Sequence, residues 1–202
     1  MQTNNLVLAS SSTYRKSLLE KLYLNFICAA PDINETAKPD ENPRKLALRL
    51  AQEKAKTLAC DYPEHLIIAA DQVAMLNHMQ LEKPGNRHNA IQQLQLSSGS
   101  QVNFYTSICI LNSATNETKS DIDTCTVHFK RLSDQQIQNY IDLEQPYDCA
   151  GSFKSEGLGI ALFERIDGED PNALIGLPLI KLIRLLNAFN IDVLDNTKLT
   201  AT

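Results

Sequence analysis

Apolar positions in the first third of the chain alternate between short continuous runs and stripes with helical spacing. The runs predict strands at Leu6–Ala9, Asn25–Ala29 and Leu66–Ala70. Apolar residues three and four positions apart predict helices at Thr13–Leu22 and Pro43–Cys60. The start of the second helix is well marked, because Asn42 supplies a capping side chain and Pro43 suits the first helical position. Strands that alternate with helices are typical of an α/β sheet.

The rest of the chain has longer β-rich stretches between its helices. It predicts strands at Val73–Leu76, Val102–Leu111 and Thr118–Leu132, and helices at Asn86–Leu96, Ser133–Leu143 and Pro178–Phe189. Turn signals at 112–117 join the two long stretches into an antiparallel hairpin. We therefore expect an α/β fold with a mixed twisted sheet, flanking helices and two lobes around a cleft. In this interpretation residues 1–190 form one domain and residues 191–202 form a tail.

Composition and charge narrow the class of protein. The chain has 202 residues, of which 43% are hydrophobic and 21% are charged, as is ordinary for a globular domain. The formal net charge of -5 argues against a partner such as DNA, RNA or an anionic membrane surface. Any anionic ligand must therefore meet a local cluster of positive charge.

Cysteine spacing and the lack of a targeting pattern bear on the compartment. The five cysteines are widely spaced and form no C-x-x-C pair, which argues against a zinc site and a disulfide framework. No apolar run reaches the roughly 18 residues that span a bilayer, and Met1–Leu8 lacks the regions of a signal peptide. We expect a cytoplasmic protein.

The serines after the first predicted strand are the first candidate for chemistry. Ser10, Ser11 and Ser12 precede a helix whose opening turns carry Arg15 and Lys16. Hydroxyls, free backbone N–H groups and the positive helix end together suit a phosphate group. A plain helix cap explains the serines almost as well. It does not explain two cations near the helix start, where they oppose the helix dipole.

Lys54 and Asp71 are the next candidates, and each has a second interpretation. Lys54 interrupts the apolar stripe of the helix Pro43–Cys60. Either its stem packs while the ammonium reaches water, or the ammonium meets a bound anion in a cleft. Asp71 follows the apolar run Leu66–Ala70, at the strand end where α/β sheets usually bind ligands. Aspartate also commonly begins a turn, so this position alone decides nothing.

Three further polar groups complete the candidates. Asp32 and Glu35 lie in a loop and, with Asp71, present the carboxylates that a hard divalent ion prefers, although a polar loop is the ordinary explanation. Lys83 precedes a proline. The segment Cys149–Gly157 is too polar and glycine-containing for a core strand, so it is either an exposed loop or a loop that contacts a ligand.

Seven motifs, in order along the chain, resemble those of the Maf-like nucleoside triphosphate pyrophosphatases. They are Leu8–Arg15 (LASSSTYR), Asp32–Glu35 (DINE), Ala51–Ala55 (AQEKA), Ala70–Val73 (ADQV), Lys83–Pro84, Gly151–Gly157 and Ile175–Pro178 (IGLP). Within that family, Tyr14, Gln72 and Glu156 are similar to the branch that hydrolyses 7-methyl-GTP.

The resemblance implies a fold related to the inosine triphosphate pyrophosphatases, with a nucleotide cleft between two lobes. It implies hydrolysis between the α and β phosphates of a nucleoside triphosphate, with Mg²⁺ or Mn²⁺ as the cofactor and a homodimer as the assembly. Asp71 matches the catalytic carboxylate, and Glu35 with Asp71 matches the metal site. The phosphate-binding positions are Ser10, Ser12, Arg15, Lys54 and Lys83, and the specificity positions are Tyr14, Gln72 and Glu156.

Base selection has a physical basis in this resemblance. Methylation at N7 makes guanine cationic, so Tyr14 would attract it by a cation–π contact, and Glu156 would accept hydrogen bonds from the guanine edge. Three positions depart from the family pattern: Thr13 and Tyr14 stand where proline and tryptophan are common, and Glu82 stands where glycine is usual. These departures are expected to affect rate and base preference.

Three alternatives remain open. The sister branch of the family acts on dTTP and UTP, and its residues at positions 14, 72 and 156 typically differ from those of this chain. A nucleotide-binding regulator linked to cell division is a second alternative, although binding alone has no use for a positioned catalytic carboxylate. A structural domain with solvated polar clusters is the third, and the ordered motifs argue against it.

Overall fold

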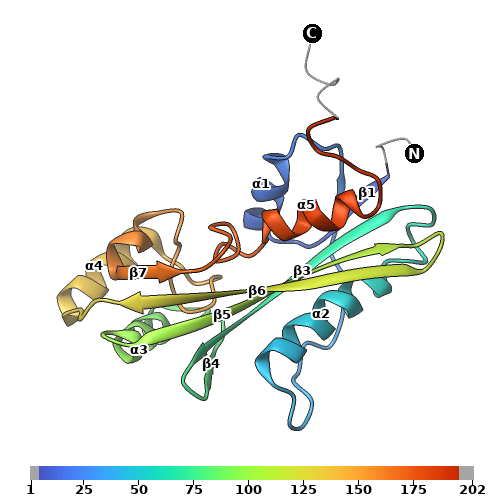
Figure 1. Cartoon of the computed structure of the whole chain (residues 1–202). Helices are drawn as coiled ribbons and strands as arrows, with labels where there is room; N and C mark the ends of the chain where they lie inside the picture. The colour runs from blue at the N-terminus through green and yellow to red at the C-terminus, as the bar shows by residue number, and fades with distance from the viewer. Residues whose placement is uncertain (1–4, 196–202) are drawn as a thin grey trace.

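Three long antiparallel strands form the centre of the fold (Figure 1). The computed structural model describes residues 5–195. In it, β3 (Leu66–Leu76) pairs with β5 (Gln101–Asn112), and β5 pairs along its whole length with β6 (Glu117–Phe129). The tight turn between β5 and β6 makes the predicted hairpin, which is confirmed.

Shorter strands extend this sheet on both sides to seven strands, in the order β2-β1-β3-β5-β6-β7 with β4 beside β3. The strand β1 (Leu6–Ala9) runs parallel to β2 (Ile27–Ala29) and to the first residues of β3. The strand β4 (Met79–Leu81) is antiparallel to the last residues of β3, and β7 (Phe163–Asp167) is antiparallel to β6. The sheet is therefore mixed, as the alternating pattern predicts.

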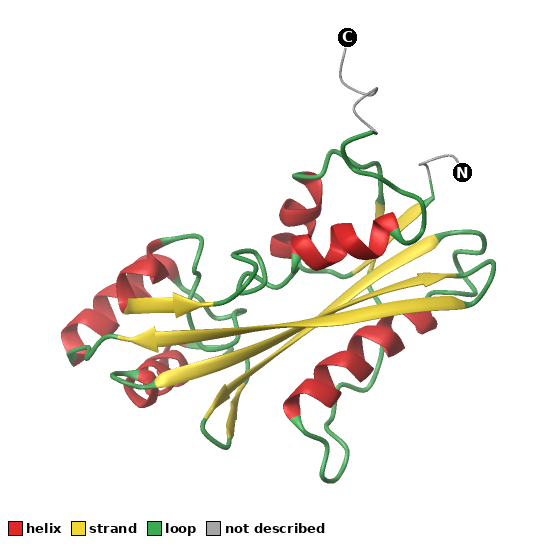
Figure 2. Ribbon diagram, viewed as in Figure 1, coloured by secondary structure: helices red, strands yellow, loops and turns green. Residues whose placement is uncertain are grey.

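Helices flank both faces of the sheet (Figure 2). They are α1 (Thr13–Glu20), α2 (Pro43–Thr57), α3 (Arg87–Ser97), α4 (Asp134–Glu144) and α5 (Leu179–Asn187), with a 3₁₀ helix, η1, at Leu158–Leu162. The side chain of the N-cap residue accepts a backbone N–H at α1 (Ser12), α2 (Asn42), α3 (Asn86) and α4 (Ser133). At α4 the predicted capping box of Ser133 and Gln136 is present.

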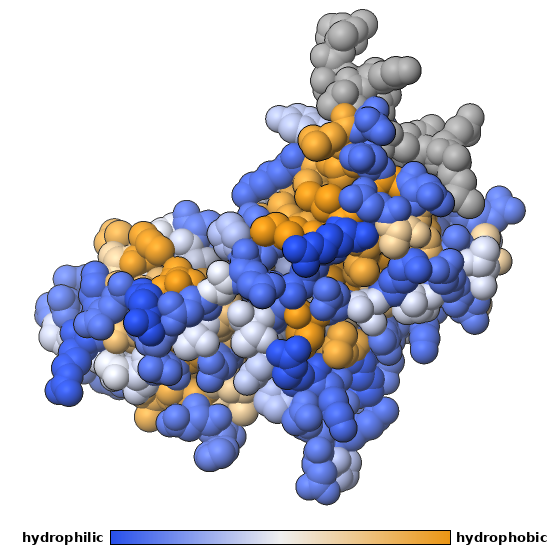
Figure 3. Space-filling view, viewed as in Figure 1, coloured by the Kyte–Doolittle hydropathy of each residue, from blue (hydrophilic) through white to orange (hydrophobic). Residues whose placement is uncertain are grey.

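The core divides between two ends of the sheet. At one end, Ile68 and Ala70 of β3 pack with α1 and α5, while Ile67 and Ala69 face α2. At the other end, Leu76 of β3 packs with residues of α3, α4 and β7. We call these the α5 end and the α4 end. In Figure 3 apolar side chains are visible at both ends, with a mostly polar surface between them.

The expected fold class is confirmed, and most elements lie where the sequence pattern predicts them. One correction concerns β3, which is a single strand although the sequence predicts Leu66–Ala70 and Val73–Leu76 as separate pieces. The polar pair Asp71–Gln72 interrupts the apolar run without ending the strand, because partners from other elements satisfy both side chains. The short strands β4 and β7 were not predicted.

The packing continues past the predicted domain boundary at residue 190. Ile191 is buried in the core of the α5 end, and Val193 packs against the same core. Residues 196–202 of the predicted tail lie outside the described residues. None of the helices in the described part of the chain is long and apolar enough to cross a membrane.

Candidate active site

A break in strand pairing defines the site. On one edge of β3, β1 pairs with Leu66, Ile67 and Ile68, and β4 pairs with Ala74, Met75 and Leu76. Within residues 5–195, no strand pairs with Ala69–Val73 on that edge. The chain leaves β1 beside this break and enters the loop Ser10–Ser12. A crevice beyond the end of a parallel strand is the usual ligand site of an open α/β sheet.

The loop after β1 is organised by its own hydroxyl groups. Ser10 is buried, and its Oγ accepts a hydrogen bond from the backbone N–H of Ser12 at 3.1 Å. Ser12 caps α1 by accepting from the backbone N–H of Arg15 at 3.3 Å. The opening amides of an eight-residue helix and its positive end thus lie next to the two predicted phosphate-binding serines.

The two cations at the start of α1 have different surroundings. The Nε of Arg15 donates to the carbonyl oxygen of Gly176 at 3.0 Å, a contact between residues 161 positions apart. Gly176 has a φ of +123°, which residues with a Cβ rarely adopt. Lys16 is exposed and pairs with Glu20 at 3.8 Å. Only Arg15 therefore belongs to the site.

Lys54, Asp71 and Glu35 meet at the centre of the site. The Nζ of Lys54 lies 2.6 Å from Oδ1 of Asp71 and 2.7 Å from Oε1 of Glu35. Lys54 and Asp71 are buried, whereas the side chain of Glu35 is 60% exposed. The apolar stripe of α2 packs on β3, so it carries Lys54 onto the sheet rather than into water. Of the two interpretations of Lys54, the solvated one is wrong.

Asp71 does not end a strand, as the sequence pattern suggested, but lies in the middle of β3. It nevertheless lies just beyond the carboxyl end of the parallel β1–β3 pairing, within the break in strand pairing. Its backbone N–H donates to Oγ of Ser107 at 3.3 Å, and Ser107 in turn donates to the carbonyl oxygen of Ala47 in α2 at 2.7 Å. Ser107 therefore joins the strand that carries Asp71 to the helix that carries Lys54.

The two carboxylates have opposite pKa shifts. Burial raises the pKa of Asp71, although the positive charges of Lys54 and Arg15 oppose this effect. Burial alone would also raise the pKa of Glu35, but the hydrogen bond and charge of Lys54 outweigh it. The charges of Lys83 and Arg15 act in the same direction, so the pKa of Glu35 is lowered. The site thus holds one firmly ionised carboxylate and one that is more basic than an ordinary aspartate.

Lys83 approaches the break in pairing from the side opposite to β1. It is exposed and lies two residues after β4, whose last residue, Leu81, pairs with Ala74 of β3. Its charge acts on Glu35 across the opening. Lys83 also lines a small hollow of about 250 Å³ between β4 and α3.

Of the three predicted specificity residues, Gln72 lies at the break in pairing, whereas Tyr14 and Glu156 lie near Cys149. Gln72 faces away from α2, and its Nε2 donates to Thr106 Oγ1 and to the carbonyl oxygens of Ala173 and Leu174. Tyr14 donates from its hydroxyl to Oδ1 of Asp148 at 3.3 Å, which joins α1 to the loop before Gly151.

Glu156 lies in the segment Cys149–Gly157, which is a loop. Its side chain is exposed, and its charge acts on the thiol of Cys149, the same thiol that lies 3.6 Å from the hydroxyl of Tyr14. Tyr14 and Glu156 thus flank one stretch of this loop. Of its residues, Gly151, Ser152 and Phe153 are buried and Glu156 is exposed, so the loop is anchored while Glu156 remains accessible.

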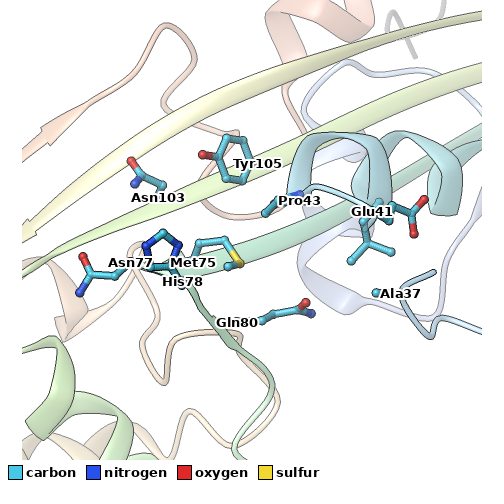
Figure 4. Close-up of a pocket in the computed structure, with 10 residues that line it drawn as sticks. Ala37, Glu41, Pro43, Met75, Asn77, His78, Gln80, Asn103 and Tyr105 are labelled. Carbon is cyan, nitrogen blue, oxygen red and sulfur yellow. The ribbon is translucent and has the colours of Figure 1, made fainter. Parts of the chain in front are cut away.

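The larger surface hollow does not coincide with the charged cluster. It has a volume of about 480 Å³ and lies between the start of α2 and the β3–β4 hairpin, with Glu41, Met75, His78 and Tyr105 in its lining (Figure 4). Asp71, Lys54 and Arg15 do not line it. Charge and hydrogen bonding, rather than the size of a cavity, therefore identify the site.

Glu35 and Asp71 fit a hard divalent ion. Both present carboxylate oxygens within 2.7 Å of one ammonium nitrogen, so they lie close enough to share a cation. The described residues contain no group of three or more potential His, Cys, Asp or Glu ligands. One or two carboxylates completed by phosphate oxygens and water is the arrangement that Mg²⁺ usually adopts with nucleotides.

Two residues of this neighbourhood, Thr106 and Ser107, were missed by the sequence analysis. They are adjacent in β5 and pair with Gln72 and Asp71, respectively, in β3. A polar pair in the otherwise apolar run of β5 was the signal that could have revealed them.

Comparisons with known proteins agree with this geometry. The chain is 52% identical over 196 residues to a 7-methyl-GTP pyrophosphatase of Colwellia psychrerythraea (strain 34H / ATCC BAA-681), covering 96% of this chain and 98% of that protein. The fold of this chain is similar to the solved structure of a HAM1 protein from Coxiella burnetii. The TM-score is 0.50, and the identity is 15% over 92% of this chain and 99% of the other. The profile of the family described as Maf-like protein matches residues 5–189. The chain therefore belongs to the Maf-like protein family.

Proposed function

We propose that this chain is a nucleoside triphosphate pyrophosphatase that hydrolyses 7-methyl-GTP to 7-methyl-GMP and pyrophosphate. The observation that carries the proposal is the meeting of Arg15, Lys54, Glu35 and Asp71 at the break in the edge of β3. The relative from Colwellia psychrerythraea, which is described by that activity, supports the choice of substrate.

The phosphates of the substrate are expected to lie between the loop after β1 and Lys83. A triphosphate carries about four negative charges, and its hydrolysis depends mostly on positioning and charge stabilisation. Arg15, Lys54 and Lys83 supply positive charge from three different elements. Ser10, Ser12 and the opening amides of α1 supply hydrogen-bond donors.

Asp71 is the proposed proton acceptor for the attacking water. Its raised pKa makes it a better base than a surface aspartate, and its short contact with Lys54 fixes the position of its Oδ1. Lys54 stays between the two carboxylates and holds them together when the substrate arrives.

A divalent cation, Mg²⁺ or Mn²⁺, is proposed as the cofactor, held by Glu35 and Asp71. When bound, it would supply charge stabilisation at the phosphates and lower the pKa of coordinated water. The lowered pKa of Glu35 keeps that ligand ionised and ready to bind a cation. Lys54 already neutralises part of the negative charge, so affinity for the metal alone should be weak without the nucleotide.

Base selection is proposed to use Tyr14, Gln72 and Glu156. Tyr14 offers an aromatic ring to the cationic base, and Glu156 offers an exposed carboxylate that accepts hydrogen bonds from guanine. Uracil and thymine present a single donor on the corresponding edge, so they lose part of this interaction.

Pyrophosphate release from 7-methyl-GTP, GTP, dTTP and UTP at equal concentrations tests the proposal. We expect 7-methyl-GTP to give the highest kcat/KM. We also expect Asp71→Asn to lose about 100- to 10,000-fold in kcat while it still binds nucleotide. Asp142→Asn, an exposed residue of α4 paired with Arg87, is the matched control and should keep full activity.

The outcomes separate the alternatives. Fastest turnover of dTTP would assign the chain to the sister activity and remove the base-recognition proposal. Nucleotide binding without any turnover would favour the regulator linked to cell division. Unchanged hydrolysis by Asp71→Asn would remove Asp71 from the mechanism. A homodimer and a cytoplasmic location stay predictions, and light scattering on the purified chain tests the first.

A further inference from the structure

One loop joins the two ends of the molecule and crosses the sheet directly over Gln72. This crossover loop, residues 170–178, runs between β7 and α5 (Figure 1). Its Leu174 packs into the core of the α4 end, whereas Leu177 packs into the core of the α5 end. The position of this loop therefore depends on both cores and on whatever fixes it to the sheet between them.

Thr106 fixes the crossover loop to the sheet. It is fully buried, and its Oγ1 donates to the carbonyl oxygen of Ala173 at 2.9 Å. Gln72, which pairs directly with Thr106 across β3 and β5, donates to the same carbonyl oxygen at 3.0 Å and to that of Leu174 at 3.1 Å. The loop thus rests on the two side chains through two adjacent carbonyl groups.

The same contacts determine which way the amide of Gln72 faces. The hydroxyl hydrogen of Thr106 is used on Ala173, so its oxygen is left to accept from Nε2 of Gln72 at 3.0 Å. All three neighbours of that nitrogen are then acceptors. A flipped amide would place its oxygen against two carbonyl oxygens, which is unfavourable. Thr106 and the loop therefore hold the NH₂ group inward.

The side-chain amide oxygen of Gln72, Oε1, remains available to a ligand. No residue among 5–195 donates a hydrogen bond to it, and Gln72 lies in the stretch 69–73 of β3, which has no strand partner on the edge between β1 and β4. An amide held in this orientation offers a hydrogen-bond acceptor only. The guanine edge carries the N1–H and N2–H donors, whereas uracil and thymine carry one N–H between two carbonyl groups.

We propose that Thr106 is a specificity-determining positioning residue, which selects guanine bases by locking the amide of Gln72 with its carbonyl oxygen toward the substrate. The inference rests on the proposed function, because it concerns the base of the same nucleotide. It assigns the selection to a residue that touches no substrate and acts through Gln72 and the crossover loop.

The test compares kcat/KM for 7-methyl-GTP with kcat/KM for UTP in matched variants. Thr106→Val removes the hydroxyl and keeps the side-chain shape. We expect the ratio to fall about tenfold, because the crossover loop loses its hydrogen bond to Thr106 and no longer holds the carbonyl oxygens of Ala173 and Leu174 against the amide. Thr106→Ser keeps the hydroxyl and should keep the ratio. Thr126→Val is the control, since Thr126 bonds Asn103 on the opposite face of the sheet and should leave the ratio unchanged.

A double-mutant cycle separates positioning from a general structural effect. Gln72→Met removes the amide, so adding Thr106→Val to Gln72→Met should not change the ratio further. An equal fall of the ratio with and without Gln72 would overturn the proposal, and so would an unchanged ratio in folded Thr106→Val. If Thr106→Val does not fold, Thr106→Ala removes the same hydroxyl without adding a methyl group.

The failure of this inference can be told from the failure of the proposed function. A wild-type chain that prefers 7-methyl-GTP, with an unaltered ratio in the Thr106 variants, contradicts only the positioning role. A wild-type chain that does not hydrolyse 7-methyl-GTP contradicts the proposed function. Calorimetric binding of 7-methyl-GMP and UMP repeats the comparison of variants without any turnover, and equal binding ratios in wild type and Thr106→Val would also overturn the inference.

Discussion

Helix α2 carries two clusters of the same composition that differ in almost every other respect. Each has one cation between two carboxylates, and the cations, Arg49 and Lys54, are five residues apart in the chain. Arg49 binds Glu41 through two hydrogen bonds of 2.7 Å and binds Glu53 at 2.9 Å. It also donates to the carbonyl oxygen of Thr36 at 3.1 Å.

The two clusters differ in the electrostatic state of one carboxylate, since the pKa of Glu41 is lowered and that of Asp71 is raised. Hydrogen bonds from Arg49 lower the pKa of Glu41 to about 2, so the fold stabilises this carboxylate in its ionised form. Burial raises the pKa of Asp71 even though Lys54 lies 2.6 Å away. The planar guanidinium matches a carboxylate with two parallel bonds, whereas the ammonium is a single point between two acceptors.

A short ion pair therefore does not by itself lower the pKa of a carboxylate, because burial can outweigh it. The Arg49 cluster ties the loop 36–41 to α2 and leaves little binding capacity for a ligand. The Lys54 cluster keeps a basic carboxylate and an accessible one, Glu35, at an opening in the sheet. A functional site can keep a carboxylate whose ionisation is disfavoured, because a raised pKa makes the carboxylate a better base.

The largest expected difference between the clusters is in turnover. Lys54→Met should lose about 100-fold or more in kcat/KM, because it removes one of the cations proposed to stabilise the phosphates. Arg49→Met should keep most of its turnover and should lower the melting temperature instead. Pyrophosphate release and differential scanning calorimetry on both variants measure this. Similar losses of turnover in both variants would contradict the division into a catalytic and a structural cluster.

The next difference is in stability near neutral pH. Glu41→Gln should lower the melting temperature, because it removes a carboxylate that the fold stabilises in its ionised form. Asp71→Asn should leave it equal or raise it, because the fold disfavours ionisation of Asp71 and asparagine has no charge to bury. The measurement is thermal unfolding at pH 7 with a chelator present. A clear fall for Asp71→Asn would mean that the ion pair with Lys54 outweighs burial.

The sequence predicted the elements of the fold well wherever the repeating pattern of apolar residues extended over many positions. The hairpin β5–β6 and the helix α2 are examples, because each has many apolar residues in one repeating pattern. The strands β4 and β7 have three and five residues, and only the last residue of β4 and the first of β7 are buried. Such strands exist because a longer neighbour offers them free backbone groups, which a local pattern does not record.

Within the candidate site, the order of the motifs along the chain was more informative than any single residue. It correctly indicated the family, and it named Lys54 while leaving two interpretations of its ammonium. The choice between them depended on Glu35 and Asp71, which lie 19 and 17 positions away along the chain. The hydrogen bond from Thr106 to the carbonyl oxygen of Ala173 joins residues 67 positions apart, so no local spacing could predict it.

The smallest expected difference is in the acid dependence of stability, and it should have opposite directions in the two clusters. Glu41 has a pKa of about 2 in the fold against an ordinary value of 4.5, so its contribution is full above about pH 4.5 and is lost as the pH falls toward 2. The advantage of wild type over Glu41→Gln should therefore stay constant from pH 7 to 5 and shrink below that.

The pKa of Asp71 is raised in the fold above its ordinary value of 3.8. Ionised Asp71 therefore lowers the free energy of unfolding at neutral pH, and this effect is absent below pH 3.8. Any advantage of Asp71→Asn over wild type should then disappear as the pH falls below 3.8. Acidic groups that do not share a cation with the substituted residue titrate alike in each pair of proteins and cancel in the difference. Urea midpoints of the three proteins at pH 7, 5, 4 and 3, with the chelator present, measure both trends. Parallel trends for the two variants would show that Lys54 holds Asp71 ionised as firmly as Arg49 holds Glu41, and the distinction between the two clusters would then rest on turnover alone.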